Sequence, residues 1–69
     1  HILENIHALL DYNQVPKQLE DRALHFSQMF NLTLEESQKV LSGEQVPNKM
    51  LLKKIADKFE VDPIWLLRN

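Results

Sequence analysis

The chain has 69 residues, of which 43% are hydrophobic, 26% are charged and none is cysteine, and its formal net charge is −2. This length and composition indicate one globular domain spanning residues 1–69, and they exclude a disordered chain, a disulfide framework and a thiolate metal site. The acidic balance does not by itself indicate a nucleic-acid binder, and no apolar run reaches the ~18 residues of a membrane span. Since the chain begins at His1 rather than methionine, we expect it to be part of a longer protein.

Apolar residues recur at helical spacing along most of the chain, and its single glycine leaves few hairpin signals, so we predict an all-α fold. A first helix is expected over residues 2–13, with an apolar stripe at Ile2, Ile6, Leu9 and Leu10. A second helix is expected to have Pro16 in its first turn and to end at Asn31, which tolerates the left-handed conformation. Its predicted buried residues are Leu19, Ala23, Phe26 and Phe30.

Thr33 and Glu36 have the spacing of a capping box, which predicts the start of a third helix. This helix is expected to run from Leu34 to about Ser42 and to stop at Gly43. Both glutamates of its first turn are favoured there by the helix dipole, so they have a structural reason to be present.

Asn48 is a favourable N-cap for a fourth helix through Phe59, and Asp62-Pro63 predicts the start of a short fifth helix. The predicted buried residues of the fourth helix are Met50, Leu51 or Leu52, Ile55 and Phe59. The fifth helix should hold Ile64, Trp65 and Leu67. Most lysines fall within residues 39–58, where a solvated helix face and an interaction surface are both open explanations.

From about residue 26 onward, the order and spacing of residue types resemble those of a known family of domains. Residues 26–33, FSQMFNLT, look like a pattern that has a large apolar residue, a small residue, two polar positions (here Gln28 and Met29), an apolar residue, glycine or asparagine, an apolar residue, and serine or threonine. The further elements are Gly43, Pro47-Asn48, Leu52, Ile55-Ala56, Val61 and Trp65-Leu66-Leu67. Together they resemble the Cro/C1-type, or XRE-type, helix-turn-helix domains of phage repressors and their bacterial relatives. The resemblance implies a compact five-helix lambda-repressor-like bundle, with the helix-turn-helix at residues 23–30 and 34–41.

Carried over position by position, this resemblance implies a sequence-specific transcriptional regulator whose third helix enters the major groove of double-stranded DNA. The implied base contacts are Leu34, Glu35, Gln38 and Lys39. The side chains implied to face the core are Ser37, Val40 and Leu41. The implied phosphate contacts are Ser42, Asn48 and Lys49.

The resemblance also implies that the protein pairs with a second copy of itself, and it implies a cellular location. Such domains bind palindromic operators as homodimers. We expect the dimer contact to lie outside this segment or to involve Ile64, Trp65 and Leu67. A bacterial or phage-encoded protein of the cytoplasm, associated with the nucleoid and not with a membrane, is implied as well.

One departure from the family leaves a second function open. The family usually has more arginine or lysine around its third helix, whereas here that helix begins with Glu35 and Glu36. An acidic third helix would also suit a scaffold that contacts a basic protein partner.

No catalytic residue, cofactor or metal ion is predicted. His1, His7 and His25 lack the i, i+4 spacing of a helical zinc site, so we expect them at the solvent edge or in packing. The serines have no base arranged with them in the sequence, so an enzyme is not expected.

Overall fold

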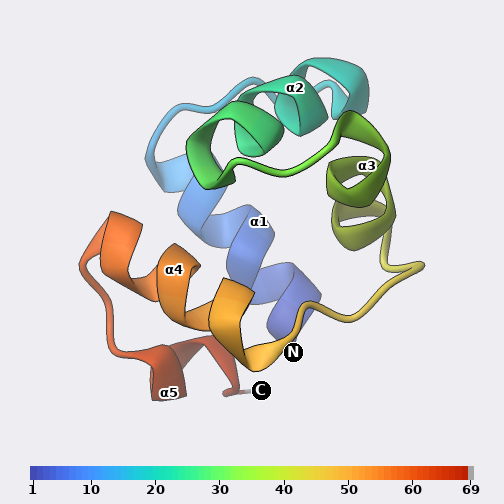
Figure 1. Ribbon diagram of the computed structural model, residues 1–69. Coiled ribbons are helices and arrows are strands. Elements are labelled where there is room, and N and C mark those ends of the chain that lie inside the picture. The colour runs from blue at the N-terminus through green and yellow to red at the C-terminus, as the bar shows by residue number, and fades with distance from the viewer. Residues whose placement is uncertain (69) are drawn as a thin grey trace.

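Five α-helices follow one another along residues 1–68, the part of the chain that the structure, a computed structural model, describes (Figure 1). They are α1 (Ile2–Tyr12), α2 (Leu19–Phe30), α3 (Leu34–Ser42), α4 (Lys49–Phe59) and α5 (Pro63–Leu66). Figure 1 shows α1 in the middle of the bundle, with α2 and α3 on one side and α4 and α5 on the other. Residues 1–68 contain no strand, so the predicted all-α class is confirmed. None of these helices is both long and apolar enough to cross a membrane.

The local signals of α3 act as predicted at both of its ends. At the start, the backbone N–H of Glu36 donates to Thr33 Oγ1 at 3.0 Å, and the N–H of Thr33 donates to Glu36 Oε1 at 3.5 Å. This reciprocal pair is the expected capping box. At the other end, Gly43 adopts φ 84°, which favours glycine because a Cβ is strained there.

The start of α2 differs from the sequence prediction. Pro16 lies before the helix and not in its first turn, because α2 begins at Leu19 and Gln18 is its N-cap. The side chain of Gln18 accepts from the backbone N–H of Asp21 at 2.9 Å. The carbonyl of Pro16 instead accepts a hydrogen bond from Arg22 Nε at 2.8 Å, which holds the connecting segment against α2.

The core is made of apolar side chains from all five helices. Its buried members are Ile6, Leu9, Leu10, Ala23, Phe26, Phe30, Val40, Leu41, Leu51, Ile55, Ala56 and Leu66. Two side chains predicted to be buried are not: Leu19 is 45% exposed and Met50 is 70% exposed. Leu19 is the first residue of α2 and lies beside α3 at the surface, and Met50 is rotated by about 100° from Leu51 on α4.

The short helix α5 is attached to the first helix by a side chain. Asn5 Nδ2 lies 2.7 Å from the carbonyl oxygen of Arg68 and 3.0 Å from that of Leu66. These bonds satisfy carbonyls at the end of α5, and Leu66 is fully buried against the core. A four-residue helix is thus held by tertiary contacts and not by its own propensity.

Candidate functional site

The connection between α2 and α3 is a tight turn over residues 31–33. Asn31 adopts the left-handed conformation, with φ 54° and ψ 49°, as its position at the end of α2 predicted. The backbone N–H of Leu32 donates to the carbonyl of Ser27 at 3.0 Å, which closes the end of α2. The turn and the capping box after it set the direction in which α3 leaves α2.

The two faces of α3 have opposite character. Ser37, Val40 and Leu41 are 0%, 1% and 3% exposed, so the inward facing predicted for them is confirmed. On the other face, Glu35 and Gln38 are exposed and Lys39 is partly exposed. Leu34, at the start of the helix, is 45% exposed. The predicted base-contact residues therefore belong to one accessible surface of α3.

A shallow surface hollow of about 360 Å³ runs along the outward face of α3, and we call it the α3 hollow. It is lined by Leu19, Glu20, Glu35, Gln38, Lys39, Ser42 and Glu44. The first turn of α2 and the loop after α3 thus contribute to this surface, together with the predicted base-contact residues of α3. The lining includes three carboxylates and one ammonium group, so the surface is acidic at neutral pH.

Leu19, Glu20 and Glu44 also belong to this surface, which the sequence pattern does not predict. No local pattern connects them with α3, since they come from the preceding helix and the following loop. Only the packing of α2 against α3 brings these side chains beside Gln38.

The predicted phosphate-contact residues are not gathered at one place. Ser42 lines the α3 hollow, and its Oγ donates to the carbonyl of Lys39 at 3.2 Å. Asn48 lines a different hollow, and its Oδ1 accepts from the N–H of Leu51 at 2.8 Å, so this side chain caps α4. Lys49 is exposed in the first turn of α4.

The residues predicted for a dimer contact divide into exposed and packed side chains. Ile64 and Leu67 are 65% and 56% exposed, whereas Trp65 is partly buried against the core. Leu67 follows α5 and lines an apolar hollow with Leu3 and Val46. The end of the described chain therefore carries two accessible apolar side chains.

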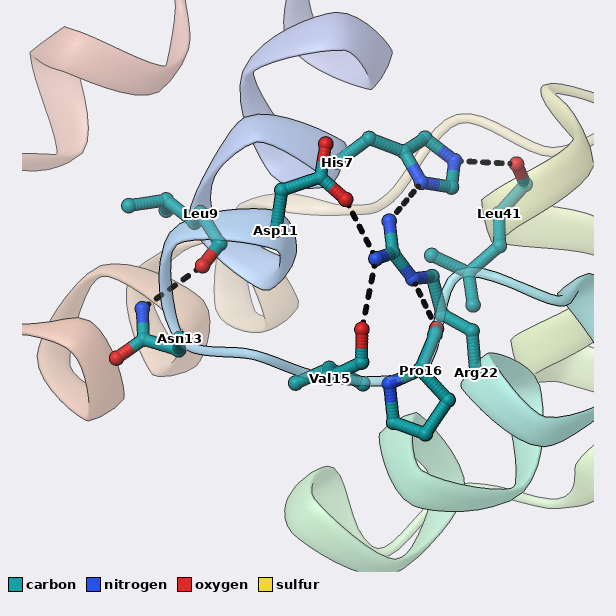
Figure 2. Close-up of polar contacts among 8 residues, drawn as sticks. All are labelled: His7, Leu9, Asp11, Asn13, Val15, Pro16, Arg22 and Leu41. Carbon is teal, nitrogen blue, oxygen red and sulfur yellow. Dashed lines mark hydrogen bonds and ion pairs between the residues drawn. The ribbon is translucent and has the colours of Figure 1, made fainter.

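A buried arginine lies beneath the end of α3 (Figure 2). Arg22 is only 3% exposed, and Nη2 donates to Asp11 Oδ1 at 2.6 Å and to the carbonyl of Val15 at 2.9 Å. Its Nη1 lies 2.9 Å from His7 Nδ1, and His7 Nε2 lies 2.8 Å from the carbonyl oxygen of Leu41. The bond from Arg22 lowers the pKa of the Asp11 carboxyl below its usual range, against the desolvation that raises it.

This cluster, Asp11–Arg22–His7, connects α1 and α2 with the last turn of α3, and the sequence expectations do not contain it. From the sequence, Arg22 contributes only to the charge balance. One sequence signal was present: Arg22 lies four residues before Phe26, on the buried face of its helix, where an arginine needs several partners.

Within residues 1–68, no three histidine, aspartate or glutamate side chains are grouped to hold a metal ion. Comparison of the chain with protein-family models, with curated proteins and with solved structures finds no match.

Proposed function

We propose that this domain is a lambda-repressor-like helix-turn-helix module that binds double-stranded DNA sequence-specifically through the outward face of α3 and thereby regulates transcription. The observation that carries this proposal is the division of α3 into two faces. One face is buried through Ser37, Val40 and Leu41, and the opposite face presents Gln38 and Lys39 to solvent. An α-helix with one such free face fits the major groove of B-DNA.

The side chains of that face have the chemistry needed to distinguish bases. The amide of Gln38 can pair with adenine through two hydrogen bonds, and the ammonium of Lys39 can donate to guanine O6 and N7. The Glu35 carboxylate can accept from the cytosine amino group, and Leu34 can contact a thymine methyl group. A good bidentate contact discriminates against a wrong base by about 1–3 kcal/mol.

The acidic character of the α3 hollow predicts weak binding to DNA of arbitrary sequence. Nonspecific affinity comes mainly from cations that neutralise phosphates, and this hollow holds only Lys39 for that purpose. Backbone N–H groups at the starts of helices can still hold phosphate oxygens. Tight binding would then require two copies on half-sites about one helical turn apart.

Replacing Gln38 or Lys39 with alanine should reduce affinity for the selected site roughly 5- to 150-fold without unfolding the domain. Both side chains lie outside the core, so the unfolding midpoint should stay nearly constant. The measurement is selection from a random duplex pool, followed by titration of the enriched site at two salt concentrations. Gln28→Ala and Lys58→Ala are matched controls, since both residues are exposed and neither lines the α3 hollow. No enriched site, or equal losses in the controls, would contradict the proposal.

A second candidate function is supported by the carboxylates of the α3 hollow. Glu20, Glu35 and Glu44 would suit a lysine-rich protein segment better than a phosphate backbone. In this alternative, the same helix pair is a protein-binding scaffold.

Glu35→Gln should affect the two functions in opposite directions. Removing this carboxylate should strengthen binding of duplex DNA of arbitrary sequence about threefold or more at low salt, because phosphate repulsion falls. It should weaken binding of a lysine-rich peptide by a similar factor, because an attractive charge is lost. Both are measured by fluorescence titration of labelled ligand, with Glu4→Gln, exposed on α1 and outside the hollow, as the control. Weaker binding of the selected duplex by Glu35→Gln would assign Glu35 to a base contact.

A further inference from the structure

The imidazole of His7 is held from both sides (Figure 2). Arg22 Nη1 lies 2.9 Å from Nδ1, and the carbonyl oxygen of Leu41 lies 2.8 Å from Nε2. A guanidinium has only N–H donors, so Nδ1 must be the acceptor of that bond. The carbonyl can only accept, so Nε2 must carry the hydrogen. The two neighbours therefore require the neutral ring in one tautomer.

Adding a proton to this ring would remove the bond to Arg22. The ring lone pair that can take a proton is the one on Nδ1, which accepts from Arg22, and a proton there turns the acceptor into a donor that faces another donor. Two positive groups would then be in contact where Arg22 is only 3% exposed, so little water could screen them. His7 would have to turn away, and its bond to Leu41 would be strained or lost.

The other charged groups around His7 do not reverse this effect. Glu4 and Asp11 share the α1 face of His7, Lys17 lies in the connection to α2, and α3 presents the carbonyl of Leu41. Asp11 attracts a positive ring, but its side chain is 47% exposed and already bonds Arg22. Glu4 is also exposed, so solvent screens it. Arg22, in direct contact with Nδ1, is the dominant neighbour.

We propose that His7 is a positioning residue for α3 that acts only with its ring neutral, so that protonation of the ring releases the C-terminal turn of α3. Leu41 is in the last turn of α3, next to Ser42 and two residues after Lys39. Loosening this turn would displace the outward face of the helix. The consequence for DNA rests on the proposed function, whereas the loosening itself does not.

The test is to measure amide hydrogen-exchange protection factors along α3 by NMR between pH 5 and pH 8. Wild-type protection in the last turn of α3 should fall about tenfold as the His7 ring takes up a proton. His7→Gln should remove this pH dependence. Its amide oxygen can accept from Arg22, its NH₂ can donate to Leu41, and it does not titrate in this range. His25→Gln is the matched control, because His25 is exposed and bonds the carbonyl of Asp21 in its own helix.

A second measurement needs no variant. The ¹⁵N shifts of the His7 ring at pH 8 should show hydrogen on Nε2 and a free lone pair on Nδ1. Hydrogen on Nδ1, or equal pH dependence of α3 protection in wild type and His7→Gln, would overturn the proposal. Asp11 does not interfere. Because the bond from Arg22 lowers the pKa of its carboxyl in the folded state, its contribution to stability is present above the ordinary pKa of an aspartate and is lost only as the pH falls below that.

Titration of the selected duplex over the same pH range separates this inference from the proposed function. Loss of DNA affinity on acidification in wild type, but not in His7→Gln, would support both. If the hydrogen-exchange protection of α3 depends on pH but the domain selects no duplex, the role of His7 is supported and the proposed DNA binding is overturned.

Discussion

Arg22→Ala should remove a large part of the domain's stability and move its urea unfolding midpoint to a much lower concentration. The guanidinium donates to the carbonyls of Val15 and Pro16 and to His7 Nδ1, so its removal leaves three acceptors without their donor. These acceptors are partly buried, and a polar group left without its partner costs about 1–3 kcal/mol, so we expect a total loss of about 3–5 kcal/mol. A domain of 69 residues is stable by only roughly 3–10 kcal/mol. The ion pair with Asp11 adds little, since that carboxylate is half exposed.

Urea unfolding followed by circular dichroism measures this loss as a shift of the midpoint. Arg68→Ala is the matched control, because it removes an arginine from an exposed position outside the core. Arg22→Lys is informative as well: it keeps the charge but cannot make the forked set of bonds, so most of the loss should remain. If Arg22→Ala unfolds within about 0.5 kcal/mol of wild type, the buried cluster does not stabilise the fold.

Phe26→Ala should destabilise the domain by about 3–5 kcal/mol, the usual range for removing a buried aromatic ring. Phe26 is 0% exposed, and its ring centroid lies 4.8 Å from that of Phe30. Phe30 in turn lies 6.3 Å from Phe59, so the three rings connect α2 with α4. Alanine would leave a cavity at the start of this chain of contacts, and rigid helices on several sides limit its collapse.

The same urea experiment tests this expectation. Leu24→Ala is the control, since Leu24 is in the same helix but 47% exposed, and a loss below about 1 kcal/mol is expected there. Equal losses at the two positions would mean that Phe26 is not a core residue. Phe26→Leu should recover part of the stability, because it restores most of the apolar volume.

The helix boundaries and the facing of α3 could be read from the chain because they depend on neighbours. Thr33 and Glu36 are three residues apart, and Gly43 and Asn31 each act through their own backbone conformation. The apolar spacing of Val40 and Leu41 likewise follows from one helical period. These signals predicted the bounds and the inward face of α3, the helix that carries Gln38 and Lys39.

The other features of the candidate site depend on how the helices pack against one another, so the sequence did not predict them. Met50 is apolar, as core residues are, yet the way α4 packs against its neighbours leaves this side chain 70% exposed. Glu20 and Glu44 reach the α3 hollow only because α2 and the loop after α3 lie beside Gln38. The negative charge of these two glutamates changes which ligands the surface can bind. It could not be predicted from the residue spacing within α3, because neither glutamate belongs to that helix.

The all-α class, the five helices, both caps of α3, the N-caps of α4 and α5 and the inward face of α3 were predictable from the chain alone, because each depends on residues a few positions apart. The tertiary structure decided the start of α2, the acidic surroundings of Gln38 and the burial of Arg22. The partners in the buried cluster explain the difference: Arg22 meets His7 from fifteen residues away, and His7 meets Leu41 from thirty-four. Contacts at such separations arise only when the helices pack, and here they connect the stability of the core with the position of α3.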